Sequence, residues 1–155
     1  SVNSSVKSAI DLLRAAGIAT AIATGNSYSC GRISWPACIS TSVSVGSSTK
    51  SDGDSSFNNW DSVTQRLYAP GSSIYSSTGD SDSSYASWNG TSMATPHVAG
   101  AWALLRQAFP TAGVTTLLTA LRTKGKLIYS VCDGYNAGIP RIQIDKASNR
   151  WAASF

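Results

Sequence analysis

Residues 89–100 read Asn89-Gly90-Thr91-Ser92-Met93-Ala94-Thr95-Pro96-His97-Val98-Ala99-Gly100, a polar turn followed by small and apolar residues. The apolar spacing predicts a helix from about Ser92 to Phe109, where Pro110 disfavours further helical geometry. A serine in the first helical turn lies beside unpaired backbone N–H groups and the positive end of the helix dipole. An attacking oxygen and a developing oxyanion are both stabilised there. Taken alone, however, such a serine is more often a helix N-cap.

The whole string resembles the nucleophile segment of the subtilisin-like serine proteases, in which Gly-Thr-Ser-Met-Ala-x-Pro-His-Val-Ala-Gly surrounds the catalytic serine. Segments 36–46, 68–74 and 140–145 resemble further parts of the same family, so the resemblance covers nearly the whole chain. It implies a serine endopeptidase that hydrolyses polypeptide substrates through an acyl-enzyme on Ser92. It also implies an α/β fold, a doubly wound, mainly parallel sheet with helices on both faces. Residues 1–155 are then the C-terminal part of a subtilisin-like peptidase domain, incomplete at its N-terminal side.

Local patterns predict alternating helices and strands, as in a parallel sheet. Apolar residues at helical spacing indicate helices over 1–16 and from Val114 to about Lys124. Short apolar or alternating runs indicate strands over 17–23, 39–45, 66–69 and 139–144, the first of them buried on both faces. A hairpin is expected around the Gly79-Asp80 turn, and residues 47–60 read as a polar surface connection.

Asn26 is the second candidate for the site. It follows Ala23-Thr24-Gly25 at the carboxyl end of a predicted strand, where open α/β sheets place their ligands. By itself an asparagine after a glycine is usually a turn residue. Together with the Ser92 string, the segment resembles the family's oxyanion-hole asparagine, and the resemblance implies that Ala23, Thr24 and Gly25 wall the pocket for the substrate side chain. Such an amide contributes about 10²–10³ in rate, a magnitude taken from subtilisin itself.

Two parts of the family's catalytic machinery have no counterpart in the sequence. The family's aspartate lies in an Asp-Ser/Thr-Gly segment and its base in His-Gly-Thr-His, and neither occurs here. The single histidine, His97, follows Ser92 by five helical positions, which places it about 140° around the helix axis. We therefore expect His97 to pack against the helix rather than to act as the base.

Three functional interpretations follow from this departure. The chain is part of a secreted endopeptidase whose remaining half supplies the acid and base, or it is a non-catalytic homologue that acts as a peptide-binding or inhibitory module. A nucleophile-elbow hydrolase would need a histidine later in the chain, and none follows His97, so this third interpretation fails. The expected partners are a polypeptide substrate and the missing N-terminal half of the catalytic domain.

Composition favours an extracellular setting. Only 13% of residues are charged, and the net charge of +4 comes from scattered lysines and arginines, which argues against nucleic-acid binding. No apolar run approaches the ~20 residues that a bilayer requires, so no membrane partner is expected. The sequence starts on a polar segment at Ser1 and shows no signal peptide. If the protein is secreted, we expect its signal peptide to have been removed or to lie upstream of Ser1.

The cysteines number three, an odd count. Cys30 and Cys38 flank a short loop and are expected to form a disulfide, the alternative being two reduced thiols, while Cys132 is expected to bond to neither. With one histidine, the spacing offers no zinc site, and no metal ligand or cofactor is assigned. Calcium, which occurs in the family, cannot be placed from the sequence.

Overall fold

The computed structural model describes residues 4–130, 132 and 137–149. Its centre is a five-stranded sheet of order β1-β2-β3-β7-β6, in which β1, β2, β3 and β7 run parallel and β6 pairs antiparallel with β7. The sheet strands are β1 (Ala21–Ala23), β2 (Val43–Ser48), β3 (Leu67–Pro70), β6 (Lys126–Tyr129) and β7 (Gly138–Arg141). A separate hairpin pairs β4 (Ile74–Ser77) with β5 (Tyr85–Trp88). The expected α/β architecture with a mainly parallel sheet is confirmed.

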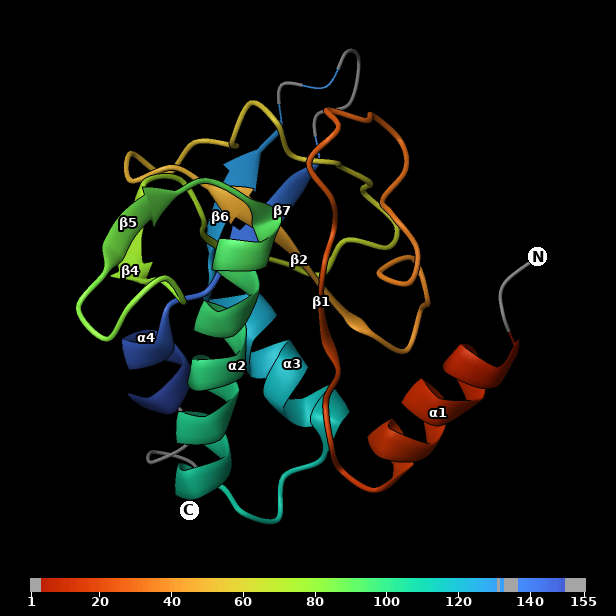
Figure 1. The fold of residues 1–155 in the computed structure, drawn as a ribbon. Helices are drawn as coiled ribbons and strands as arrows, with labels where there is room; N and C mark the ends of the chain where they lie inside the picture. Colours follow the sequence, from red (N-terminus) through yellow and green to blue (C-terminus); the bar gives the residue numbers. More distant parts are fainter. Residues whose placement is uncertain (1–3, 131, 133–136, 150–155) are drawn as a thin grey trace.

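Helix α2 (Thr91–Ala108) forms the centre of the main core, on one face of the sheet (Figure 1). Its buried residues recur at helical spacing and include Ala94, Val98 and Leu105, which pack with Val45 of β2 and Leu67 of β3. Helix α3 (Val114–Lys124) and helix α4 (Ile144–Asn149) complete this layer. The packing fixes the start of α2 beside the carboxyl ends of β1 and β2.

The other face of the sheet is covered by connecting segments. A second apolar cluster there contains Trp60, Tyr68, Ile128, Cys132 and Ile139. Tyr68 belongs to this cluster because it points to the opposite side of β3 from Leu67 and Ala69. The segment that ends at Trp60 is therefore part of the core and not only a surface connection.

Several boundaries differ from those expected. Helix α1 (Ser4–Ala15) lies within the helix expected over 1–16, whose first three residues fall outside the described part. Residues 36–42 form successive turns, which moves the strand expected over 39–45 to Val43–Ser48. The last expected strand ends at Arg141, and α4 begins at Ile144 because Ile144 and Ala147, three residues apart, both pack on the main core.

Strand β1 lies at one edge of the sheet. Its three residues are only partly buried, whereas a strand buried on both faces was expected. The side of β1 opposite β2 thus has no strand paired to it among the residues that the structure describes. In the same part of the chain, no helix combines the length and apolar character needed to cross a membrane.

Candidate active site

The start of α2 places Ser92 at the protein surface. Gly90 precedes the helix, and its N–H donates to the carbonyl oxygen of Gly71 at 2.8 Å. Ser92 is exposed in the first helical turn. Pro96, four residues later, has no N–H to donate to the Ser92 carbonyl, so the first turn of the helix is held by fewer internal bonds.

Asn26 is held directly against the residue before Ser92. Its Oδ1 accepts hydrogen bonds from the Thr91 N–H and from the Thr91 hydroxyl, both at 2.9 Å. Thr91 in turn accepts from the Gly25 N–H at 3.1 Å through its Oγ1. Thr91 is fully buried, and the three bonds are partly buried. They join the end of β1 to the start of α2 across 65 or 66 sequence positions.

The Asn26 amide nitrogen and the Ser92 backbone N–H border one small space beside Gly90. A Cβ built on Gly90 would lie 3.4 Å from Asn26 Nδ2 and 3.7 Å from the Ser92 nitrogen. Because the Asn26 oxygen is already occupied by Thr91, its amide is oriented with Nδ2 toward this space. Two N–H donors that border the same space can bind an oxygen that carries negative charge.

The three residues expected to wall the substrate pocket have different environments. Ala23 ends β1 and is partly buried. Thr24 is fully buried, and its hydroxyl donates to Asn58 Oδ1 at 3.2 Å. Gly25 has a φ of 104°, and a Cβ there would lie 2.3 Å from Ser34 Oγ. Only glycine therefore fits at this point of the turn.

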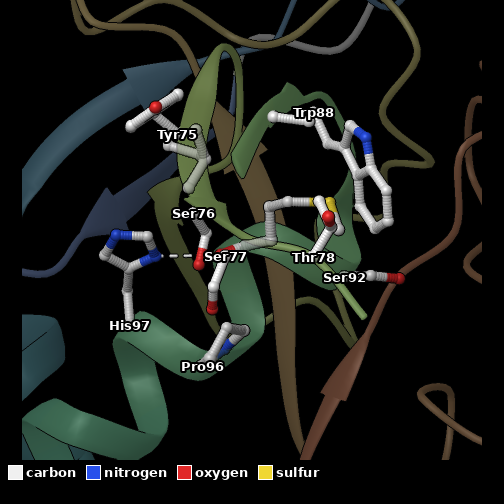
Figure 2. Close-up of a pocket in the computed structure, with 11 residues that line it drawn as sticks. Tyr75, Ser76, Ser77, Thr78, Trp88, Ser92, Pro96 and His97 are labelled. Atoms are coloured by element: carbon white, nitrogen blue, oxygen red, sulfur yellow. Dashed lines mark hydrogen bonds between the residues drawn. The ribbon is translucent and has the colours of Figure 1, made fainter. Parts of the chain in front are cut away.

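His97 lies away from Ser92, as the helical spacing predicts, but it is not a packing residue. It is exposed, and its Nδ1 is 2.8 Å from the Met93 carbonyl oxygen one turn earlier. Figure 2 shows the Ser92 hydroxyl and the His97 ring on opposite sides of a pocket between α2 and the β4–β5 hairpin. The expectation of a buried, helix-packing histidine is wrong because this face of α2 borders that pocket.

The pocket beside Ser92 has a volume of about 450 Å³ and a mixed apolar and hydroxyl lining. Trp88 and Ile74 contribute from the hairpin, and Met93, Pro96 and His97 from α2 (Figure 2). Among the residues the structure describes, no group of three or more His, Cys, Asp or Glu side chains lies close enough to hold a metal ion. No calcium ligand is therefore assigned within that part of the chain.

Sequence reasoning missed two residues that hold Asn26 and a third buried amide beside them. Thr91 fixes the Asn26 amide and Asn59 bonds the main chain after Asn26, whereas Asn58 bonds Thr24 Oγ1, the Ser47 N–H and the Tyr68 hydroxyl. Asn58 and Asn59 are 1% and 3% exposed, although residues 47–60 read as a polar surface connection. Their burial is tolerated because their amides bond groups of other segments, among them Thr24, Ser27 and Ser34. Adjacent asparagines ahead of a tryptophan were the only available hint.

Asp54, a partly buried ionisable residue, lies behind these asparagines. Asp54 Oδ2 accepts from the Ser130 hydroxyl at 2.7 Å, and Asn58 Nδ2 donates to the Tyr68 hydroxyl at 3.4 Å. Burial raises the pKa of the Asp54 carboxyl above its ordinary value, although bonds from Ser130 and its neighbours partly oppose the rise. Burial, together with the nearby Asp54, also raises the pKa of Tyr68.

The disulfide differs from the one expected. Cys30 is bonded to Cys132, with the two Cα atoms 5.6 Å apart, and Cys38 is a free, partly buried thiol. The short Cys30–Cys38 separation was misleading because residues 36–42 fold into turns that carry Cys38 elsewhere. The Asp54–Ser130 bond brings the segment before Cys132 to this side of the molecule. The disulfide spans 102 positions and ties the segment after Asn26 to the end of β6.

Comparison with known proteins identifies the family. The profile of the Subtilase family, Peptidase_S8, matches residues 1–143. Alkaline serine exoprotease A of Vibrio alginolyticus is 37% identical over 90% of this chain and 28% of that protein, and an extracellular serine proteinase of Thermus sp. (strain Rt41A) is 39% identical over 68% and 26%. The crystal structure of a cold adapted subtilisin-like serine proteinase matches with a TM-score of 0.77 and 34% identity, covering 91% of this chain and 51% of that one. The chain thus spans about a quarter of these relatives and half of this solved chain, and it belongs to the subtilase family of serine peptidases.

Proposed function

We propose that residues 1–155 are the C-terminal part of the catalytic domain of a secreted serine endopeptidase, the part that carries the nucleophile and the oxyanion hole. The observation that carries this proposal is the double hydrogen bond from Thr91 to Asn26 Oδ1, which turns Asn26 Nδ2 toward the space shared with the Ser92 N–H. The extracellular relative and the disulfide support secretion.

In the proposed reaction, Ser92 Oγ attacks the carbonyl carbon of a peptide bond. The carbonyl oxygen becomes an oxyanion and accepts hydrogen bonds from Asn26 Nδ2 and the Ser92 N–H. The Ser92 proton passes to a base and then to the departing amine, which leaves an acyl-enzyme. Water, activated by the same base, attacks the ester, and Ser92 regains its proton as the acid product leaves.

The base is supplied from outside these residues. The one histidine of the chain, His97, faces the opposite side of the pocket and contacts the Met93 carbonyl (Figure 2). An open groove of about 530 Å³ between α2 and the segment around β1 is the proposed contact surface for the rest of the domain. Ile18, Ala99 and Trp102 line it together with Arg106, and it borders the side of β1 to which no strand of the described residues is paired. The chain covers only half of the solved relative, which supports such a partner.

Ala23, Thr24 and Gly25 are proposed to form the wall of the substrate pocket by their shape rather than by bonding. The Thr24 N–H donates to Val45, and the Gly25 N–H to Thr91. The carbonyl of Thr24 accepts a bond from the Ser34 N–H, and the carbonyl of Gly25 accepts one from the Asn59 N–H. The backbone groups of Thr24 and Gly25 are thus already engaged within the chain, so the substrate contacts mainly surface and space at these two residues.

Labelling with a fluorophosphonate tests the proposal in the complete polypeptide that contains this sequence. We expect labelling at Ser92, its loss in Ser92→Ala, and a rate of peptide hydrolysis about 10²–10³ lower in Asn26→Ala, the range known for the corresponding change in subtilisin. The alternative function, a peptide-binding or inhibitory module, predicts binding of a peptide without labelling or turnover. Labelling at another serine would exclude the assigned nucleophile.

A further inference from the structure

Asn59 holds the segment that carries Asn26. Its Oδ1 accepts hydrogen bonds from the Ser27 N–H at 2.8 Å and the Ser29 N–H at 3.1 Å. Its Nδ2 donates to Ser34 Oγ at 3.0 Å. Ser27 immediately follows Asn26, so the side chain of Asn59 fixes the chain one residue beyond the proposed oxyanion donor.

The backbone around Asn59 continues the same contact. The Asn59 N–H donates to the Gly25 carbonyl at 3.0 Å, and the Trp60 N–H to the Ser29 carbonyl at 2.9 Å. Asn26 is therefore held at two places. Thr91 bonds its side-chain oxygen, and Asn59 bonds the main chain of the residue before it, Gly25, and of the residue after it, Ser27.

We infer that Asn59 is a positioning residue for the oxyanion hole: it sets the place of Asn26 Nδ2 without touching the substrate. The inference rests on the function proposed above. Removing the Asn59 amide leaves the Ser27 and Ser29 N–H groups without their buried acceptor, and the segment must shift to satisfy them. A displacement of about 1 Å of a catalytic group can cost on the order of 10² in rate.

Asn58 provides a matched control at the neighbouring position. It has the same side chain and is similarly buried, but its amide bonds Thr24 Oγ1, the Ser47 N–H and the Tyr68 hydroxyl. None of these bonds reaches the main chain next to Asn26. Asn58→Leu thus removes a comparable buried amide and leaves the proposed support of Asn26 in place.

The test measures kcat and KM for a peptide anilide with the complete protease and its variants. We expect Asn59→Leu to lower kcat by roughly 10- to 100-fold with little change in KM, and Asn58→Leu to lower stability while changing kcat less than about threefold. Asn59→Asp should retain most of the activity, because a carboxylate oxygen can accept from both N–H groups and the Ser34 hydroxyl can turn to donate. Should Asn59→Leu fail to fold, Asn59→Ser gives the same readout with room for a water.

A double substitution shows whether Asn59 acts through Asn26. In an Asn26→Ala background the oxyanion donor is already gone, so adding Asn59→Leu should cause no further loss of kcat. Independent, multiplying losses would overturn the inference, as would equal effects of Asn59→Leu and Asn58→Leu on kcat. If Asn26→Ala leaves kcat unchanged, the oxyanion role fails and this inference with it, whereas a loss in Asn26→Ala alone overturns only the role of Asn59.

Discussion

The two sides of β1 are built in different ways. Toward β2 and the start of α2, the segment after β1 is held by partly buried hydrogen bonds with Thr91 and Asn59. On the other side lies an open, largely apolar groove against α2, where Ile18 is 53% exposed. The difference fits the proposal that this chain fixes the donors of the oxyanion hole, whereas the base and the cover of the groove come from residues outside it.

The largest expected effect concerns the chain by itself. Without a base Ser92 remains a weak nucleophile, so residues 1–155 alone should show no peptide hydrolysis above background and label poorly with fluorophosphonates. In subtilisin itself, loss of the base lowers kcat by about 2 × 10⁶-fold. Adding the preceding part of the catalytic domain in trans should restore labelling at Ser92. Rapid labelling of the isolated chain would mean that the base has been misassigned.

The disulfide should make a large contribution to the stability of the chain, because it ties the segment after Asn26 to the end of β6. Cys30 and Cys132 close a loop of 102 positions, for which the loop-entropy treatment gives about 4–5 kcal/mol. We expect Cys30→Ser to lower the free energy of unfolding by several kcal/mol, measured by urea denaturation. Cys38→Ser, which removes a free thiol, serves as control and should cost less than about 1 kcal/mol. A Cys38 variant as unstable as the Cys30 variant would contradict the pairing.

Filling the space between the two donors should reduce activity without unfolding the chain. A Cβ at Gly90 would make a tight contact of 3.3 Å with Met93 Sδ, which this flexible side chain can relieve by a small shift, and would lie beside Asn26 Nδ2 and the Ser92 nitrogen. In the complete protease we expect Gly90→Ala to lower kcat about 10- to 100-fold, with a melting temperature within a few degrees of wild type. Gly100→Ala, on the same helix with open space around it, is the control. Unchanged kcat in Gly90→Ala would show that the oxyanion lies elsewhere.

These contrasts also explain which features could be predicted from the sequence. The family was predictable because the Ser92 string and the Asn26 segment are compact motifs, whereas the roles of Ser92 and Asn26 in the reaction stay predictions. The Cys30–Cys132 bond was not, because it depends on where Asp54 and Ser130 bring two distant segments together. Asn59 was hidden for a similar reason: a polar residue reads as exposed unless its buried partners, here Ser27 and Ser34, are known.

The open side of β1 should make the isolated chain self-associate. Among the residues that the structure describes, β1 is an edge strand beside an apolar groove, and such an edge can pair with another chain. Ile18→Lys places a charge in the groove, and since burying an isoleucine is worth about 1.5–3 kcal/mol, the association constant should fall roughly 10-fold or more. Sedimentation velocity measures the change, with Val63→Lys as an exposed control outside the groove. A monodisperse wild-type monomer at high concentration would argue that the groove needs no cover.

The smallest expected effect tests the partly buried carboxyl of Asp54, which lies behind Asn58 and Asn59. Burial raises the pKa of Asp54 above its ordinary value near 3.8, so the folded state holds the proton more tightly than the unfolded chain. In the window between that ordinary value and the raised one, the folded state binds more protons, and stability must therefore fall as the pH rises through it.

The amide introduced by Asp54→Asn resembles the protonated carboxyl, and its oxygen can still accept from Ser130. The substitution should then remove this part of the pH dependence and gain stability relative to wild type at pH 7 but not at pH 3. Urea denaturation at both pH values measures the difference, with the exposed Asp82→Asn as control. A variant that loses more stability at pH 7 than at pH 3 would show that the charged carboxylate supports the fold.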